Sequence, residues 1–284
     1  MSQNIYNEVQ AHYGEIAKRS NTVTTQQDPE EQIAKAFGYT GTDLSSLPSK
    51  ANMGLSCGNP TAFANMKPGE TILDLGSGGG IDVLLAARKV GPEGKAIGVD
   101  MTEEMITLST SNAESAKLTN TLFIKSTITA IPLPDSSIDC IISNCVINLV
   151  PKPDKQCVFH EIARLLRPGG RIAISDILAR RELPEAVVSD MAMHVGCVAG
   201  ASLVGEYEEF LRVAGFQDLL IVDTKSDLNL YKQFSYLPQG QAGCCGSGAA
   251  AKGSVDGCAD VNLNEWAGSF QIYAVKGGRD TKEV

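Results

Sequence analysis

Two groups of residues in this 284-residue chain have the types and spacing needed for chemistry: a glycine-rich segment preceded by an acid, and eight cysteines. The glycine-rich segment runs from Leu73 to Gly80 and includes Asp74. Glycines there allow a tight turn and let backbone N–H groups approach a ligand closely. Asp100 closes the next apolar stretch, where a carboxylate would bind the hydroxyls of a ribose. The pattern predicts a nucleotide-type cofactor site.

Asp74 discriminates between two classes of cofactor. A dinucleotide site places a diphosphate at the helix N-terminus, and a carboxylate two residues before Gly76 would oppose that negative charge. The same carboxylate suits a ligand that carries an ammonium or a sulfonium group, as S-adenosylmethionine does. We therefore expect S-adenosylmethionine as the cofactor, and a nicotinamide oxidoreductase is disfavoured.

The cysteines occupy positions 57, 140, 145, 157, 197, 244, 245 and 258. The amino terminus lacks the basic start and apolar segment of a secretory signal, so we expect a cytoplasmic protein with reduced thiols. Cys57 and Cys197 lie next to glycines that would give a ligand access. Cys140 and Cys157 are interpreted as small core residues, and Cys145 as a packing residue near the cofactor.

Candidate bases are few. The chain has three histidines, His12, His160 and His194, and none lies in an obvious carboxylate-backed site. Oxygen and nitrogen methyl acceptors often need a general base. Few bases and many thiols together favour an acceptor that needs sulfur ligands but no deprotonation.

Strands and helices must position these residues, and the apolar pattern predicts them. The expected elements of the core are strands over Thr71–Leu75, Lys95–Val99, Thr121–Lys125, Ile138–Ser143 and Arg171–Ser175, and helices over Ile81–Lys89, Glu103–Lys117 and Lys155–Leu166. This alternation predicts an α/β fold with a Rossmann-like, doubly wound and mostly parallel sheet that has helices on both faces.

We expect three parts along the chain. Residues 1–70 form a helical and loop segment that carries Cys57, with Tyr39–Pro60 interpreted as loop. Residues 71–177 form the cofactor-binding core, and residues 178–284 form a substrate-binding and C-terminal region.

The last part is expected to be helical over most of 178–204 and again over Tyr207–Ala214. Two further strands are predicted, Leu219–Val222 and Phe270–Val275. Between them, the Gly-, Ala- and Ser-rich stretch at about 240–258 is predicted to be a mobile loop.

Charge and hydropathy exclude two classes of partner. With 24 basic and 33 acidic residues the net charge is −9, which would repel the phosphates of nucleic acid. The longest apolar runs, such as Cys145 to Val150, are too short to span a bilayer. We expect neither a nucleic acid nor a membrane as partner.

The pattern Asp74-x-Gly76-x-Gly78-x-Gly80 resembles the first motif of class I S-adenosylmethionine-dependent methyltransferases, and Leu165 to Gly170 resembles a later one. In that family an acid usually holds the adenine amino group at the position of Thr127, where a backbone group or the hydroxyl would take its place. The resemblance implies eight cofactor-binding residues, namely Asp74, Gly76, Gly78, Asp100, Met101, Thr127, Ile128 and Asn144.

Three cysteine-containing segments resemble a narrower family, the arsenite methyltransferases: Cys57 to Pro60, Ser143 to Leu149 and Gly196 to Ala201, together with the opening Val9 to Gly14. The resemblance implies that Cys57 and Cys197 are catalytic, arsenic-binding thiols. Trivalent arsenic is soft, prefers thiolates and keeps a lone pair at the apex of its pyramid. The implied reaction is a detoxification: methyl transfer from S-adenosylmethionine to arsenite or methylarsenite, giving methylated arsenicals and S-adenosylhomocysteine. An external thiol reductant of the glutathione or thioredoxin type would assist.

One departure from that family concerns a third thiol. Many members carry one directly after a Gly-Phe pair, whereas Gln217 follows Gly215 and Phe216 here. This predicts a preference for methylarsenite, or help from an external thiol or from the tail, where Cys244 and Cys245 are candidate additional arsenic ligands beside Cys258.

Three alternatives stay open. The tail cysteines could be incidental thiols of a linker. The chain could methylate another small molecule. It could also be a thiol-rich arsenic-binding protein without catalysis, although the absence of a Cys-x-x-Cys pair disfavours zinc.

Overall fold

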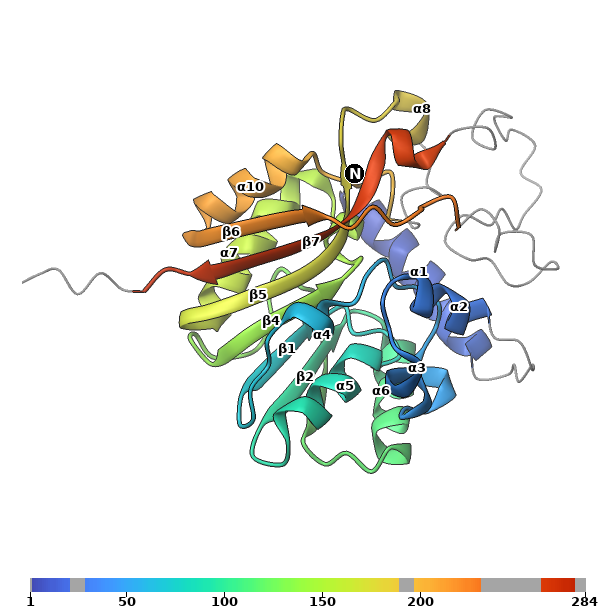
Figure 1. Cartoon of the computed structure of the whole chain (residues 1–284), viewed down its shortest axis with the longest axis vertical. Helices are drawn as coiled ribbons and strands as arrows, with labels where there is room; N and C mark the ends of the chain where they lie inside the picture. The colour runs from blue at the N-terminus through green and yellow to red at the C-terminus, as the bar shows by residue number, and fades with distance from the viewer. Residues whose placement is uncertain (1, 21–28, 189–196, 231–261, 279–284) are drawn as a thin grey trace, which may run out of the picture.

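A seven-stranded sheet organises the molecule, in the order β3-β2-β1-β4-β5-β7-β6 (Figure 1). The computed structural model describes the chain except residues 1, 21–28, 189–196, 231–261 and 279–284. The strands are β1 (Thr71–Leu75), β2 (Lys95–Asp100), β3 (Thr121–Lys125), β4 (Ile138–Asn144), β5 (Leu166–Ala179), β6 (Phe216–Asp223) and β7 (Ala267–Lys276). Strands β1 to β5 are parallel, and β7 runs antiparallel between β5 and β6. The predicted α/β class with a mostly parallel sheet is confirmed.

Helices cover both faces of this sheet. The α-helices are α1 (Ser2–Ser20), α2 (Pro29–Ala36), α3 (Gly41–Ser45), α4 (Pro60–Phe63), α5 (Ile81–Val90), α6 (Glu103–Ser115), α7 (Lys155–Leu165), α8 (Glu185–Val188) and α10 (Val204–Val213). The part of the chain that the structure describes also contains four short 3₁₀ helices: η1 (Ser49–Ala51), η2 (Ile147–Leu149), η3 (Lys152–Asp154) and η4 (Leu263–Glu265). None of the described helices has the length and apolar character needed to cross a membrane.

Alternating side chains of the strands build two cores. Ile72 points to the face covered by α4 and α5, where it packs with Val83 and Ala86. Leu73 points to the opposite face and shares a core with Phe159 of α7. Because both faces of the central strands are buried, their sequences are almost continuously apolar rather than alternating.

The parallel register brings the carboxyl ends of the central strands to one edge. Leu75 of β1 lies beside Ser143 of β4, and Asn144 lies beside Ser175 of β5. In an open α/β sheet this edge is where ligands bind.

Two predictions of local structure were wrong. The expected helix over most of 178–204 is absent from its first part, because β5 continues to Ala179 by pairing with Ala267 of β7. Among the described residues of that range, only Glu185–Val188 and Val204, the first residue of α10, are helical. The predicted loop Tyr39–Pro60 contains α3, whose N-terminus has a capping box formed by Thr40 and Asp43.

The predicted boundary at residue 177 falls inside β5, and β6 and β7 extend the sheet of the expected core. The two parts therefore share one sheet. The glycine-rich stretch at 240–258 lies outside the described residues.

Candidate functional site

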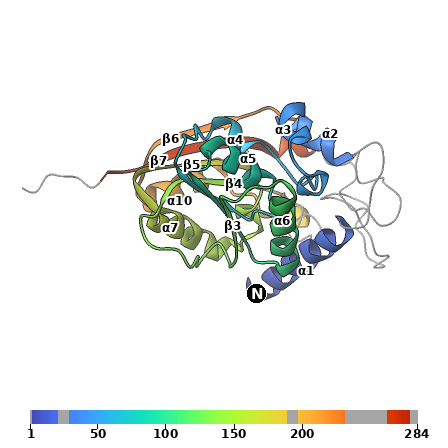
Figure 2. The ribbon, with the colours of Figure 1, turned by 90° about the horizontal axis from the view of Figure 1, so that it is seen from below.

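A cleft opens at the carboxyl edge of the sheet, between the loops that follow the strands and helix α1. Figure 2 shows α1 lying beside α6, and Tyr13 of α1 lines the cleft together with Met105 of α6. All eight residues predicted to bind the cofactor line this cleft: Asp74, Gly76, Gly78, Asp100, Met101, Thr127, Ile128 and Asn144.

The glycines keep the cleft open. Gly76 and Gly78 have φ angles of 68° and 50°, which side chains rarely adopt. A Cβ atom at Gly76 would lie 2.4 Å from the Val146 side chain. Beside them the buried hydroxyl of Ser77 lines the cleft and has no hydrogen-bond partner among the described residues. An unpartnered buried donor at this place is available to a ligand.

Three carboxyl groups give the cleft its charge preference. Burial raises the pKa of Asp74 well above its usual value, with further contributions from Asp82 and Asp100. Burial also raises the pKa of Asp82 to about 6, against hydrogen bonds from Tyr39 and Asn144 that lower it. A ligand with positive charge would relieve this crowding of buried acids. S-adenosylmethionine, which carries an ammonium and a sulfonium, fits this requirement.

Two backbone hydrogen bonds orient the Asp100 carboxylate so that it can accept hydrogen bonds from a neutral ligand group. Its Oδ2 accepts the Gly78 N–H at 3.1 Å and its Oδ1 accepts the Thr102 N–H at 2.9 Å. These bonds fix the carboxylate at the end of β2 and leave lone pairs for ribose hydroxyls.

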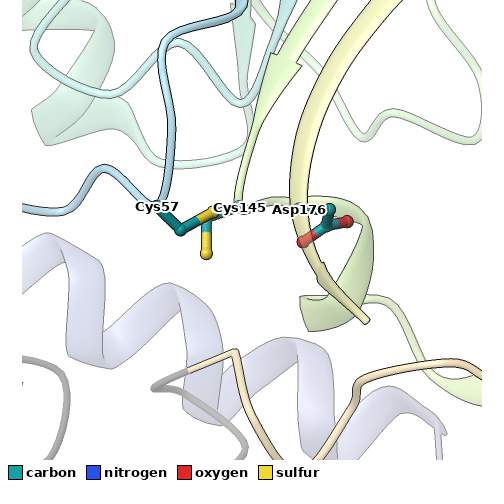
Figure 3. Close-up of side chains that lie close together, drawn as sticks. All are labelled: Cys57, Cys145 and Asp176. Atoms are coloured by element: carbon teal, nitrogen blue, oxygen red, sulfur yellow. The ribbon is translucent and has the colours of Figure 1, made fainter. Parts of the chain in front are cut away.

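A cluster of buried sulfur atoms adjoins this cleft. The Sγ atoms of Cys57 and Cys145 and a carboxylate oxygen of Asp176 all lie within 4.8 Å of one another (Figure 3). Cys197 joins them, because its Sγ donates a hydrogen bond to the Cys145 carbonyl oxygen at 2.8 Å. Cys145 itself lines the cleft. The structure therefore brings both predicted thiols, Cys57 and Cys197, next to Cys145. We call Cys57, Cys145 and Cys197 the thiol site.

Cys145 is buried in an apolar cluster and lines the cleft, as expected of a packing residue near the cofactor, and its sulfur also lies close to that of Cys57. It follows β4 directly, at the sheet edge, and has a φ of 61°. The Cys145 N–H donates to the Ser175 carbonyl oxygen at 2.9 Å, which holds this turn against β5. Cys197 also has a positive φ, 65°. Non-glycine residues held in this region are typical of functional sites.

Asn144 connects the cleft to the Cys57 loop. Its Oδ1 accepts the Cys57 N–H at 3.1 Å, and its Nδ2 donates to the Gly58 carbonyl oxygen at 2.8 Å and to the Tyr39 hydroxyl at 2.9 Å. The Tyr39 hydroxyl in turn donates to Asp82 at 2.8 Å. One amide therefore couples the geometry of the acids to that of a thiol.

The surroundings of Cys145 and Cys197 favour their neutral, protonated form in the free protein. Burial raises the pKa of Cys145 well above its usual value. The pKa of Cys197 is also raised, first by its hydrogen bond with Cys145 and then by burial. A soft ion that binds these sulfur atoms must displace their protons.

Gln217 lies far from the thiol site. It pairs with Val275 of β7, which pairs with Arg171 at the opposite end of β5 from Asp176. Arg171 and Asp176 are five residues apart along β5, which corresponds to a distance of about 16 Å. A thiol at position 217 would not reach the site, so the prediction of a missing ligand there has no support in this fold.

Two further described cysteines, Cys140 and Cys157, lie outside the thiol site. Cys140 is buried, with its Sγ directed at the Ala64 carbonyl oxygen, and Cys157 is exposed on α7. The interpretation as a small core residue is therefore confirmed for Cys140 and wrong for Cys157. Cys244, Cys245 and Cys258 lie outside the described residues.

Sequence reasoning did not assign Cys145 to the arsenic site, and it missed Asp82 and Tyr39. Asp176, directly after the fifth predicted strand, is expected from the sequence to face the arsenic pocket, and it lies near the Sγ atoms of Cys57 and Cys145. For Cys145 a signal existed, since it lies within the Ser143 to Leu149 segment that carries the family resemblance. The other residues reach the site through pairings far apart in sequence, such as the one between Tyr39 and Asp82.

Comparisons with known proteins agree with this geometry. A family model described as a methyltransferase domain matches residues 66–215. An arsenite methyltransferase of Halobacterium salinarum is 47% identical over 190 residues, which cover 67% of this chain and 48% of that protein. One from Aquipseudomonas alcaligenes is 32% identical over 236 residues, which cover 77% of this chain and 64% of the relative. The chain thus spans about half to two thirds of the length of these curated relatives.

A solved structure shows the same likeness. An arsenic(III) S-adenosylmethionine methyltransferase from Chlamydomonas reinhardtii superposes with a TM-score of 0.60 at 29% identity. The match covers 88% of this chain and 75% of that one. The resemblance predicted from the cysteine-containing segments is confirmed.

Proposed function

Because the chain belongs to the methyltransferase-domain family and is similar to the arsenite methyltransferases within it, we propose that it transfers a methyl group from S-adenosylmethionine to thiolate-bound trivalent arsenic. One observation carries the proposal. Buried thiols from three distant parts of the chain, Cys57, Cys145 and Cys197, lie together beside a cleft lined by acids and glycines.

The thiol site suits trivalent arsenic. Arsenic in this state binds three sulfur atoms in a pyramid and keeps a lone pair, and thiolate is the ligand that soft ions prefer. As each As–S bond forms, an As–O bond breaks, and the thiol proton leaves with the hydroxyl group as water. The bound arsenic needs no general base, because its own lone pair is the nucleophile.

The cleft residues have separate tasks toward the methyl donor, which when bound supplies an electrophilic methyl group on sulfur. Asp74 and Asp82 would hold its positive groups, and Asp100 the ribose. Gly76 and Gly78 leave space for close backbone approach, and the adenosine side of the cleft is formed by Met101, Thr127 and Ile128.

Asn144 positions both partners. It lines the cleft and fixes the loop that carries Cys57. Positioning of donor and acceptor supplies much of the rate of a group transfer. In this proposal residues 1–70 contribute Cys57, residues 71–177 bind the cofactor, and residues 178–284 contribute Cys197.

Both arsenite and methylarsenite are proposed substrates, because three thiols meet the requirement of arsenite and two meet that of methylarsenite. Methyl transfer formally oxidises the arsenic, so an external thiol of the glutathione or thioredoxin type is the proposed reductant. A reducing cytoplasm is the proposed location, since the site needs free thiols. Cys244 and Cys245 remain candidate additional ligands.

The test incubates the protein with methyl-labelled S-adenosylmethionine, a thiol reductant and either arsenite or methylarsenite. We expect labelled methylated arsenicals together with S-adenosylhomocysteine. If no label is transferred to arsenic with either arsenite or methylarsenite, the proposal is contradicted. Activity on another small molecule that survives Cys57→Ser and Cys197→Ser would indicate a different acceptor. Arsenical binding without S-adenosylhomocysteine would indicate a binding protein.

A further inference from the structure

A buried lysine lies behind the thiol site. Lys155, the first residue of α7, has only 1% of its surface exposed. Its Nζ donates to the Asn148 Oδ1 at 3.3 Å, to the Ser202 Oγ at 2.9 Å and to the carbonyl oxygen of Gly200. An ammonium has three N–H groups, so each has an acceptor. Burying such a group is unfavourable unless it is satisfied in this way.

Two of the three acceptors belong to the turn that follows Cys197. Gly200 and Ser202 are three and five residues beyond that cysteine, and within the turn the Ala201 N–H donates to the Val198 carbonyl oxygen at 3.0 Å. Holding the Gly200 carbonyl oxygen therefore fixes the turn to which Cys197 is joined.

The third acceptor anchors the lysine to β5. Asn148 donates through its Nδ2 to the Asp176 Oδ1 at 2.9 Å and to the Ile177 carbonyl oxygen at 2.6 Å. Asp176 belongs to the group within 4.8 Å that includes the Sγ atoms of Cys57 and Cys145. A continuous chain of polar contacts runs from the strand beside these two thiols, through Asn148 and Lys155, to the turn beside the third.

Of the three thiols, Cys197 is the one that needs additional contacts to fix its position. Cys57 follows a loop held by Asn144, and Cys145 follows β4 directly, so both are fixed by the sheet. Cys197 lies on no regular element and has a φ of 65°. Strained backbone of this kind persists only where surrounding contacts determine it.

We propose that Lys155 is a positioning residue for the arsenical substrate, which holds Cys197 against Cys145 by anchoring the turn 198–202 to Asn148 and β5. The inference rests on the proposed function and assigns a role to a side chain that touches neither substrate nor cofactor. Its effect is confined to the arsenical, because none of its three acceptors, Asn148, Gly200 and Ser202, lines the cofactor cleft.

The variant Lys155→Met keeps the length of the side chain and removes its donors. We expect the affinity for methylarsenite to fall by roughly tenfold or more, because charge-assisted hydrogen bonds are lost. The affinity for S-adenosylhomocysteine should not change. Lys152→Met is the matched control, because Lys152 is an exposed lysine three residues earlier that pairs with Glu206. Both affinities are measured by calorimetric titration.

A double-mutant cycle separates positioning from a general structural role. If Lys155 acts through Cys197, then Lys155→Met has no further effect on methylarsenite affinity in a Cys197→Ser background. Equal effects in both backgrounds, or a parallel loss of S-adenosylhomocysteine affinity, overturn the inference. If Lys155→Met fails to fold, Ser202→Ala removes one acceptor and takes its place in the same cycle.

The unmodified protein is titrated first, which keeps the two proposals apart. Absence of methylarsenite binding there contradicts the proposed function itself. If the unmodified protein binds methylarsenite and Lys155→Met binds it with the same affinity, only the role of Lys155 is contradicted. Lys155→Arg, which keeps donors and charge, is expected to recover part of the affinity.

Discussion

At the scale of single residues, the central feature is that Cys145 lies next to two other thiols and also lines the cofactor cleft. Cys57 and Cys197 do not line the cleft. Loss of the Cys145 sulfur therefore removes the thiol on the side of the cofactor cleft. The three thiols are therefore not equivalent, although each is a buried cysteine.

Cys145→Ser is expected to lower methyl transfer to arsenite by roughly a hundredfold, since a hard hydroxyl replaces one of three soft ligands. Methylarsenite, which needs two thiols, should be affected less. Rates of label transfer with both substrates measure the difference. Cys157→Ser is the control, because Cys157 is exposed and outside the thiol site. An equal, small effect of both substitutions would remove Cys145 from the site.

Asp74→Asn is expected to weaken S-adenosylmethionine binding roughly tenfold while raising the stability of the ligand-free protein. The first effect follows from the loss of a negative charge beside a cationic ligand. The second follows because a buried, crowded carboxyl group is replaced by a neutral one, and burial raises the pKa of this group well above its usual value. Calorimetric titration and thermal unfolding at about pH 8 measure the two effects. Unchanged affinity would show that the cation binds elsewhere.

At the scale of elements, the thiol site depends on a close approach between the Cys57 loop and β5. A Cβ atom at Gly58 would lie 2.5 Å from the Ser175 Cβ. The neighbour is the base of a strand side chain, which cannot move aside without displacing the strand. Gly58 is thus required for spacing.

Gly58→Ala should accordingly push the loop from β5 and abolish most methylarsenite binding, while S-adenosylhomocysteine still binds. Gly41→Ala is the matched control, because a Cβ there meets nothing within 4 Å. Parallel titrations of both variants with both ligands provide the measurement. Retention of methylarsenite affinity by Gly58→Ala would mean that this approach is not needed for the site.

Element prediction succeeded where local pattern and tertiary pairing agreed. Strands β1 to β4 were predicted to within one residue, since each is a short apolar run between polar turns. β5 was predicted as Arg171–Ser175 and extends from Leu166 to Ala179. Its extension from Ser175 to Ala179 comes from pairing with β7, nearly a hundred residues later in the chain, and its start at Leu166 from pairing with Ile138 of β4. No local pattern reveals either pairing.

At the scale of the whole molecule, buried acids set the dependence of stability on pH. Burial raises the pKa of Asp82 to about 6 and that of Asp176 to about 7, both from an ordinary value of 3.8. At a pH between the ordinary pKa and the raised pKa of each group, the folded protein binds more protons than the unfolded chain. The contribution to stability is therefore full at low pH and is lost as pH rises through the folded-state values.

We expect the free energy of unfolding of the ligand-free protein to fall between about pH 4 and about pH 7, by up to about 1.4 kcal/mol per pH unit for each group. Burial lowers the pKa of Lys155 to about 8, so its opposite contribution begins only above this window. Denaturant titrations across the window provide the measurement, and Asp82→Asn should flatten the slope. A stability that rises over this range would contradict the assignment.

The sequence by itself determined the fold class, the cofactor cleft and two of the thiols. These follow from information that is local in the chain: apolar runs, a glycine turn after an acid, and short cysteine-containing segments. Each of the eight predicted cofactor residues lines the cleft because parallel strands must end at a common edge.

Only the tertiary structure decided which sulfur atoms meet. Cys145 joined the thiol site because a left-handed turn after β4 directs it there, and Gln217 was excluded because β6 runs antiparallel beside β7. The tie from Asn148 through Lys155 to Gly200 likewise unites segments that are distant in sequence. Such contacts depend on register and packing between separate elements, and the chain encodes these only through the folded molecule as a whole.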